Sequence, residues 1–503
     1  MTQHLAILPI IIPLFAGILQ LLPPLSGSVE RQRVFSVLLA ALLIIAIGVL
    51  GWHVMHQGVQ IYALGDWQPP FGIVLVADQL ALLMLMLTAV LGLCAILFAC
   101  GGDDKQGAYF YPLMQFQLMG INGAFLTGDL FNLFVFFEVL LIASYALLVH
   151  GGGKQRTSAA VHYVILNLVG SALFLFALAS LYGTLGTLNI AHMSLRVGEL
   201  AAGERAIAQA GGLLLLIVFG LKAALLPLHF WLPKTYASAS APVAALFAIM
   251  TKVGIYAIFR VYTVIFGDGA GELANMAQGW IWPLALLTLV LGAVGVLASP
   301  NLRQLVANLV IVSVGTLMVT FALRSEEATA AGLYYMIHST LVGGALFLIA
   351  DMIGQQRGKA FDWFVMARKL KQPTLLGILF FVAAMAVAGL PPLSGFIGKV
   401  LVLQAAHETA EMLWAWPVIL VTGLVTIVAL SRAGTTLFWR YSGDKTDAEP
   451  LSVYQVASVI ILLLTIPMLV IFAAPVTDFT QQAASQLHNY NELMQVLLPG
   501  GQD

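Results

Sequence analysis

The sequence predicts an all-α membrane protein with about 14 transmembrane helices, in which two helices are broken by proline and two five-helix repeats are inverted. The first observation is composition, because 60% of the 503 residues are apolar and 9% are charged, whereas a soluble domain carries roughly 25% charged residues. The second is the recurrence of apolar runs of about 20 residues, the length that crosses a bilayer. The third is a pair of long apolar runs interrupted by proline.

Apolar runs bounded by glycine, proline and clusters of charge define the helices in order. The first run lacks a basic segment and a small-residue cleavage site, so it is expected to be a retained span rather than a signal peptide. The expected spans are residues 5–25, 34–55, 73–99, 108–126, 129–149, 161–183, 211–233, 242–265, 280–298, 304–322, 329–352, 374–408, 416–439 and 455–474.

Basic residues in the loops predict the orientation, because loops rich in Lys and Arg remain cytoplasmic. The loops that follow odd-numbered spans hold 14 basic residues, and those that follow even-numbered spans hold 3, namely Arg196, Arg205 and Arg324. We therefore expect a multi-pass protein of the bacterial inner (cell) membrane with both termini periplasmic.

Several function classes are excluded by composition and spacing. The net charge is −1, so no basic surface for nucleic acid is expected. Cys94 and Cys100 match no zinc, haem or iron–sulfur spacing, so no metal and no cofactor are expected. The run Gly151-Gly-Gly-Lys154 lacks the earlier glycine and the following Ser or Thr of a phosphate loop, and is interpreted as a cytoplasmic loop.

Ionisable residues at mid-membrane depth are the candidate functional groups, because an intramembrane charge costs about 2.5–3.5 kcal/mol and is usually paired, hydrated or functional. Glu138 lies in the span that starts near Asp129, roughly 13 Å along a helix that rises 1.5 Å per residue. The same arithmetic places Lys222, Lys252 and His338 in one thin slab near the midplane.

Structural roles compete with a functional one at each position. A basic residue near an interface can snorkel to the headgroups, which explains Arg260 near the outer end of its span and, in part, Arg432. A lysine at the midplane cannot reach them easily, which favours function for Lys222 and Lys252. Glu138 as a counter-ion for assembly and His338 as an interhelical hydrogen bond remain alternatives.

Carboxylates near the ends of spans have a simpler explanation. Asp78, Asp129 and Asp351 lie at such ends, where helix capping or solvation at the interface accounts for a charge.

Two spans are broken in corresponding places. Span seven contains Pro227 shortly after Lys222, and span twelve contains Pro391 and Pro392 before Lys399. Broken backbone is tolerated at membrane depth only where protein buries it or water reaches it, and a matched pair is typical of inverted repeats. Two independent proline kinks remain the alternative. The expected regions are 1–107 (three N-terminal helices), 108–265 (first repeat), 280–439 (second, inverted repeat) and 455–503 (last helix and periplasmic tail).

The motifs around these residues resemble a known family. The stretches are Asp129 to Glu138, Gly220 to Pro233, Pro242 to Gly254, and Gly389 to Lys399. They are similar to the antiporter-like proton-translocating subunits shared by respiratory complex I and the multisubunit Mrp-type (Mnh, Pha) cation/proton antiporters. Three features look most like the D-type member of the Mrp antiporters. They are the phenylalanine-rich run before Glu138, the lysine at position 399 and the sequence of span ten.

The resemblance implies a role for each matching residue. Glu138 matches the essential glutamate of span five, Lys222 its partner lysine, Lys252 the central lysine and Lys399 a residue near one half-channel exit. His338 falls where the family has a span-eleven histidine or lysine. The possible accessory residues are His229, Asp78 and Asp129. The sequence of span ten differs from that of the complex I relatives, because Asn308 and apolar residues replace their Tyr-Ser-Ser motif.

The implied protein is one component of a secondary transporter and not an enzyme, with no catalytic residue. Its implied partners are subunits of the A, B, C, E, F and G types, protons, Na⁺ or K⁺, and membrane lipid. A carboxylate near a buried lysine restores the proton affinity that burial removes, so a relay from Glu138 and Lys222 through Lys252 to Lys399 is expected. The alternatives are a proton-pumping subunit of complex I or of a membrane hydrogenase, and a scaffold without transport.

Overall fold

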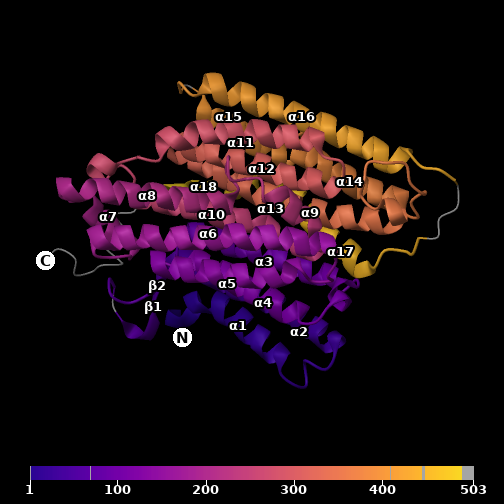
Figure 1. Cartoon of the computed structure of the whole chain (residues 1–503), viewed down its shortest axis with the longest axis horizontal. Helices are drawn as coiled ribbons and strands as arrows, with labels where there is room; N and C mark the ends of the chain where they lie inside the picture. The colour runs from indigo at the N-terminus through magenta and orange to yellow at the C-terminus, as the bar shows by residue number, and fades with distance from the viewer. Residues whose placement is uncertain (1, 68, 408, 444–447, 490–503) are drawn as a thin grey trace.

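The computed structural model describes residues 2–67, 69–407, 409–443 and 448–489. Its helices run side by side along the long axis of the molecule (Figure 1). In these residues, 12 helices are long and apolar enough to span a membrane. The shorter apolar helices α14 (Pro373–Ala388) and α15 (Ser394–Ala406) occupy the expected span 374–408, and α4 (Phe110–Leu126), with 17 residues, occupies the expected span 108–126. Each of the fourteen expected spans therefore contains helix, although its boundaries differ in places. Residues 490–503 of the expected tail lie outside the described residues.

The N-terminal helices are α1 (Leu8–Leu21), α2 (Val29–Gln57) and α3 (Gln79–Ala99). Between α2 and α3 lies an antiparallel hairpin of β1 (Gln60–Ala63) and β2 (Val74–Ala77), with Gln60 opposite Ala77. The third span therefore starts at Gln79 and not at residue 73. Asp78 explains this start, because its side chain accepts a hydrogen bond from the Ala81 N–H at 2.8 Å and caps the helix.

The next helices make up the region expected to be the first repeat. They are α4, α5 (Leu130–Leu148), α6 (Lys154–Leu185), the short α7 (Ile190–Val197), α8 (Ala202–Ala223), α9 (Leu232–Ser238) and α10 (Ala241–Val264). Asp129 caps α5 by accepting from the Asn132 N–H at 2.9 Å, which confirms its capping role. Helix α7 was not expected, because its eight residues are too few to span a membrane.

The second region contains α11 (Gln278–Ala298), α12 (Leu302–Ala322), α13 (Glu326–Arg357), α14, α15 and α16 (Met412–Trp439). Asn301 and Ser325 cap α12 and α13 through their side chains. The chain then forms α17 (Val453–Ile471) and α18 (Ala473–His488). Helix α18 replaces much of the tail that was expected after residue 474.

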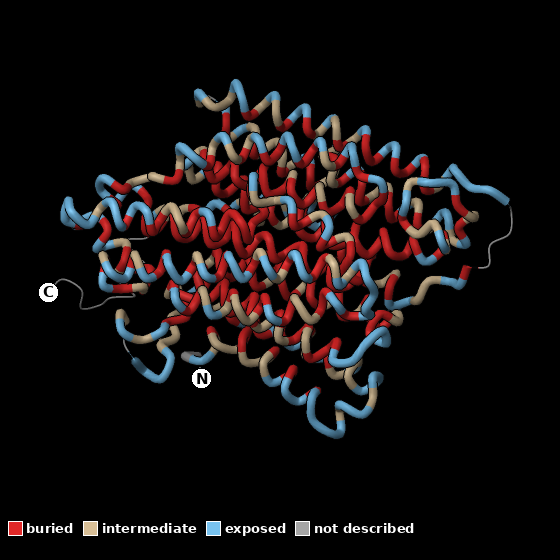
Figure 2. Tube along the Cα trace, viewed as in Figure 1, coloured by how far each residue is buried: buried red, intermediate tan, exposed pale blue. Residues whose placement is uncertain are grey.

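Helices α10 and α13 form the centre of the bundle. The most apolar window of α10 is 100% buried and that of α13 is 94% buried, against 33% for α2 and for α16. Figure 2 shows this distribution as a buried interior with an exposed outer surface. The ionisable residues Lys252 and Arg260 of α10 and His338 of α13 therefore lie inside the protein.

Candidate functional site

The break in span seven is closed by side-chain hydrogen bonds. Helix α8 ends at Ala223 and α9 begins at Leu232. The Trp231 indole N–H donates to the Leu221 carbonyl at 3.1 Å, and the Leu226 N–H donates to the Thr288 hydroxyl at 3.0 Å. These bonds satisfy backbone groups that the break removes from the helix ladder. The break is thus a stable feature that ends α8 one residue after Lys222.

Lys222 and Glu138 are joined through α6. The Lys222 ammonium donates to Asn167 Oδ1 at 2.9 Å, and the Ser171 hydroxyl donates to Glu138 Oε1. Asn167 and Ser171 are four residues apart, so they stack on one face of α6. Lys222 is 6% exposed and its ammonium lies 5.9 Å from the centre of the Phe137 ring. Two neutral side chains, one helical turn apart on α6, therefore bind the two charged groups.

Glu138 and Lys222 do not form a direct ion pair among the described residues. The physical reason is that α6 packs against both α5 and α8, and its polar side chains occupy the space between them.

Lys252 lies at the centre of the bundle. It is 0% exposed, and its ammonium donates to the Ser313 hydroxyl of α12 at 3.0 Å. Gly254, two residues later, allows α8 to approach, because a Cβ at this position would lie 2.6 Å from the Ala223 nitrogen. The glycine of the Lys-Val-Gly motif thus brings the helices that carry Lys222 and Lys252 into contact.

The second break positions Lys399 and His338. Lys399 donates to the carbonyl of Ala388, the last residue of α14, at 2.7 Å, a favourable place for a cation. His338 Nδ1 is hydrogen-bonded to the Ser394 hydroxyl at 2.8 Å. A Cβ on Gly395 would lie 2.7 Å from His338 Nε2 and 1.9 Å from the Ala386 oxygen. Only glycine fits there, which explains its place in the motif.

A narrow cavity connects the partner of Lys252 with Lys399. Its lining includes Ser313, Thr316, Tyr335, Lys399 and Thr422. The space open to a water-sized sphere is about 20 Å³, enough for about one water molecule. Lys399 thus shares this cavity with Ser313, the hydrogen-bond partner of Lys252, although Lys252 itself does not line it.

A polar cavity of about 330 Å³ lies where α10 begins. Asp103, Arg303, Asp351 and Ser240, the residue before α10, are among its lining. Burial, and next the Asp351 carboxylate, raise the pKa of the Asp103 carboxyl to about 7. The Ser240 hydroxyl is buried and has no partner among the described residues.

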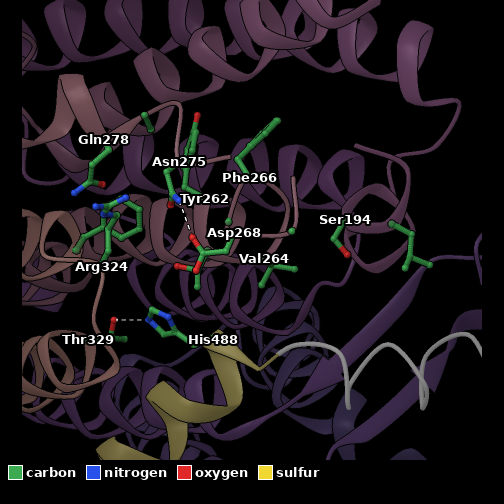
Figure 3. Close-up of a pocket in the computed structure, with 16 residues that line it drawn as sticks. Ser194, Tyr262, Val264, Phe266, Asp268, Asn275, Gln278, Arg324, Thr329 and His488 are labelled. Carbon is green, nitrogen blue, oxygen red and sulfur yellow. Dashed lines mark hydrogen bonds between the residues drawn. The ribbon is translucent and has the colours of Figure 1, made fainter. Parts of the chain in front are cut away.

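A second polar cavity, of about 370 Å³, lies where α10 ends. Figure 3 shows Asp268 bonded to Asn275, His488 bonded to Thr329, and Arg324 beside them. Tyr262 and Val264 of α10 line it as well. Lys252 is about 15–18 Å along α10 from each cavity, so the central lysine lies midway between two water-facing ends.

The structure corrects the interpretation of Arg260. It does not snorkel: it is 5% exposed and binds Asp78 through both terminal nitrogens, one of them at 2.8 Å. Tyr256 accepts two further hydrogen bonds from the guanidinium. Because other helices surround α10, the guanidinium lies inside the protein and not at its outer surface. Asp78 is likewise not solvated at an interface, although its capping role is confirmed.

The other candidates at span ends divide in the same way. Asp351 is buried and forms an ion pair with Arg303, and both line the cavity where α10 begins. Arg432 is exposed and donates to the Leu297 carbonyl at 2.6 Å, which agrees with a surface role. His229 lies in the break of span seven, with its Nδ1 buried and without a partner among the described residues.

Sequence reasoning missed the neutral residues of the site. Asn167, Ser171, Ser313 and Ser394 contact the predicted charged groups. A signal was present for the first two, since polar residues four apart in an apolar helix share a face. In the described residues, no group of three or more His, Cys, Asp or Glu side chains is arranged to hold a metal ion.

Comparison with known proteins identifies relatives along the whole chain. A family model described as NADH:quinone oxidoreductase/Mrp antiporter, transmembrane, matches residues 127–429. The D subunit of the Na(+)/H(+) antiporter of Bacillus subtilis is 37% identical, over 99% of each chain. The D subunit of the probable K(+)/H(+) antiporter of Rhizobium meliloti is 36% identical, over 96% of each chain.

Solved structures share the same architecture. A chain of the Mrp complex from Dietzia sp. is 25% identical with a TM-score of 0.86, covering 99% of both chains. A chain of respiratory complex I from Thermus thermophilus is 24% identical with a TM-score of 0.80, covering 98% of this chain and 100% of that one. This second likeness concerns the fold alone.

Proposed function

Because this chain belongs to the NADH:quinone oxidoreductase/Mrp antiporter family, as a D-type member of its Mrp branch, we propose that it moves protons in a Na⁺/H⁺ or K⁺/H⁺ exchanger through Glu138, Lys222, Lys252, His338 and Lys399. It is one component of a transporter and not an enzyme. The observation that carries the proposal is that three lysines inside the bundle bind neutral oxygens. The ion pairs among the described residues include none of them.

Lysines that are hydrogen-bonded to neutral oxygens are suited to a proton relay. A lysine bound to an amide, hydroxyl or carbonyl oxygen can release its proton without leaving a buried carboxylate unpaired. The partners of Lys222 and Glu138, Asn167 and Ser171, are one helical turn apart on α6, and two charges about 6 Å apart interact by roughly 3 kcal/mol at an effective dielectric of 20. A small movement of Glu138 therefore changes the stability of the Lys222 ammonium enough to pass its proton to Lys252.

The remaining steps follow the polar passages. The Ser313 hydroxyl contacts Lys252 and lines the cavity that Lys399 also lines. Protons reach Lys252 from the cavities at the two ends of α10, with Asp103 and Ser240 at one end and His488 at the other. His338, next to the second break, changes the proton affinity of Lys399. His229, in the first break, is an accessory group.

The two regions 108–265 and 280–439 are proposed as inverted repeats, because α8/α9 and α14/α15 are broken spans five crossings apart. The cation is Na⁺ or K⁺, since the relatives carry either name. The proposed partners are the A, B, C, E, F and G types of subunit, supported by the Mrp complex that contains a similar chain.

Both termini are proposed to be periplasmic in the bacterial inner membrane. The supporting observation is that the even-numbered loops, which hold three basic residues, lie at the end of the bundle where α7 lies, and α18 ends on the same side (Figure 1). Fusions of alkaline phosphatase and of a fluorescent protein to the C-terminus test this orientation. A fluorescent fusion together with an inactive phosphatase fusion would place the C-terminus in the cytoplasm and refute this orientation.

The function is tested by exchange in membrane vesicles. The whole operon is expressed in a cation-sensitive host, and dequenching of a ΔpH dye is recorded after addition of NaCl or KCl. Glu138→Ala and Lys222→Ala should each abolish exchange while the complex persists on a native gel. Arg432→Ala is the matched control, because this residue is exposed. Activity above about half in either alanine variant, with normal complex levels, would refute the relay.

A further inference from the structure

A pocket of about 390 Å³ lies between α6, α9 and α12, at the end of the bundle opposite α7. Four of its lining residues are basic, namely Lys154, Arg156, Lys234 and Arg303. One is acidic, Asp362, and its carboxylate already accepts from the Arg303 backbone N–H at 2.8 Å. Arg303 also pairs with Asp351, whereas Lys154, Arg156 and Lys234 form no ion pair among the described residues. The pocket is therefore positive, and the proposed relay does not use it.

The first turn of α6 faces this pocket. Gly152 and Gly153 line it together with Lys154 to Arg156, and the N-cap Gly153 has no side chain to cap the helix. Uncapped N–H groups and the helix dipole attract anions. The sequence of this loop lacks the features of a nucleotide-binding loop, so the matching anion is a single phosphate group.

Two buried donors in the same pocket lack a partner. Ser238 Oγ and Arg303 Nε have no hydrogen-bond partner among the described residues, and these residues are 6% and 9% exposed. A buried donor left without a hydrogen-bond acceptor destabilises the folded state. A phosphate oxygen accepts from both groups, whereas a cation accepts from neither. Lys154 and Lys234 are exposed at the rim and add the charge that attracts the anion.

We propose that this pocket binds the phosphate of an anionic phospholipid. The surface of α6 beyond the pocket explains why the phosphate belongs to a lipid. Exposed apolar side chains continue along one face of this helix at helical spacing, and they are Val161, Ile165, Leu168 and Leu175. This stripe suits acyl chains, and a basic pocket between helices at the cytoplasmic side suits the headgroup. A free phosphate ion would make no contact with this apolar stripe.

The bound lipid would strengthen contacts that the fold already makes, because Arg156 of α6 donates to the Ser238 carbonyl of α9 at 3.2 Å and Lys234 of α9 donates to Ser158 of α6 at 3.1 Å. Lys234 lies on α9, the second half of broken span seven, and Arg303 lies on α12. A phosphate between them holds α9 against α6 and α12, and so stabilises the break that follows Lys222.

The test uses the intact complex purified in detergent and stripped of lipid. Its melting temperature is measured against added phosphatidylglycerol, phosphatidylcholine or inorganic phosphate. Lys154→Gln with Lys234→Gln is compared with Lys105→Gln and Lys371→Gln, two lysines at the same end that do not line the pocket. At about 1 kcal/mol per basic residue, the first pair should bind phosphatidylglycerol about thirtyfold more weakly, and the control pair should bind as the wild type does.

Three results would overturn the proposal. If the two pairs of variants bound phosphatidylglycerol with the same affinity, the lipid would bind elsewhere. Phosphatidylcholine giving the same shift would remove the role of headgroup charge. Inorganic phosphate alone giving the full shift, or displacing phosphatidylglycerol, would assign the pocket to a soluble anion.

Discussion

Replacing Asn167 with alanine removes the neutral link between Lys222 and α6. The Lys222 ammonium donates to Asn167 Oδ1 at 2.9 Å, and Asn167 Nδ2 donates to the Tyr163 carbonyl at 2.8 Å, which orients the oxygen towards the lysine. Asn167 is buried, so water does not simply replace the amide. A hydrogen bond to a charged donor contributes about 1.5–3 kcal/mol, which corresponds to about a ten- to hundredfold loss of exchange if Lys222 carries the proton.

The assay is dye-monitored exchange in vesicles, alongside a native gel of the complex. Ser171→Ala removes the bond to Glu138 and should also reduce exchange. Ser180→Ala is the matched control, because this serine lies on the exposed part of α6 and bonds only to its own helix in the described structure. If α6 couples the two charges, the double variant will lose less than the product of the single losses. An Asn167→Ala complex at normal level with at least half of the wild-type exchange would refute the link.

Three further predictions concern other charges. Lys399→Ala should reduce exchange more than Arg432→Ala, because Lys399 lines the inner cavity and Arg432 is exposed; equal losses at normal complex level would contradict this. Arg260→Ala should deplete the complex on a native gel, since it leaves buried Asp78 unpaired at a cost of about 3–5 kcal/mol, and a normal level would refute it. Because the pKa of Asp103 is raised to about 7, the folded state holds this proton after the unfolded chain has lost it, so stability falls as pH rises from about 4 to about 7, by at most about 1.4 kcal/mol per pH unit. In the Asp103→Asn variant, the melting temperature should change less between about pH 4 and about pH 7 than it does in the wild type. If the melting temperatures of both proteins changed with pH in the same way, another group would be responsible.

The spans were predictable because a membrane helix is recognisable along the sequence alone. It must be long, apolar and internally hydrogen-bonded, so the fourteen runs and the two proline breaks could be located without any tertiary contact. The boundaries failed where local chemistry intervened, as at β2, where the chain is extended up to the cap residue Asp78. Helix α18 was missed because it contains several polar residues.

The candidate site was predictable only in its charged members. A lysine in an apolar run is conspicuous, whereas Asn167 and Ser313 are residue types that also occur in helices without function. Their importance depends on which neighbouring helix they face. Arg260 shows the opposite error, because a position near the end of a span suggested an interface that the central position of α10 removes.

The sequence by itself determined the number and order of the spans, the two breaks and the basic residues that the membrane must accommodate. Only the tertiary structure decided the partner of each charge. Asn167 and Ser171 stand between Lys222 and Glu138, Ser313 holds Lys252, and Arg260 binds Asp78 across a separation of 182 residues. The reason is physical: the cost of a buried charge depends on the oxygens within about 3 Å of it, and those belong to helices brought together by packing rather than by proximity along the chain.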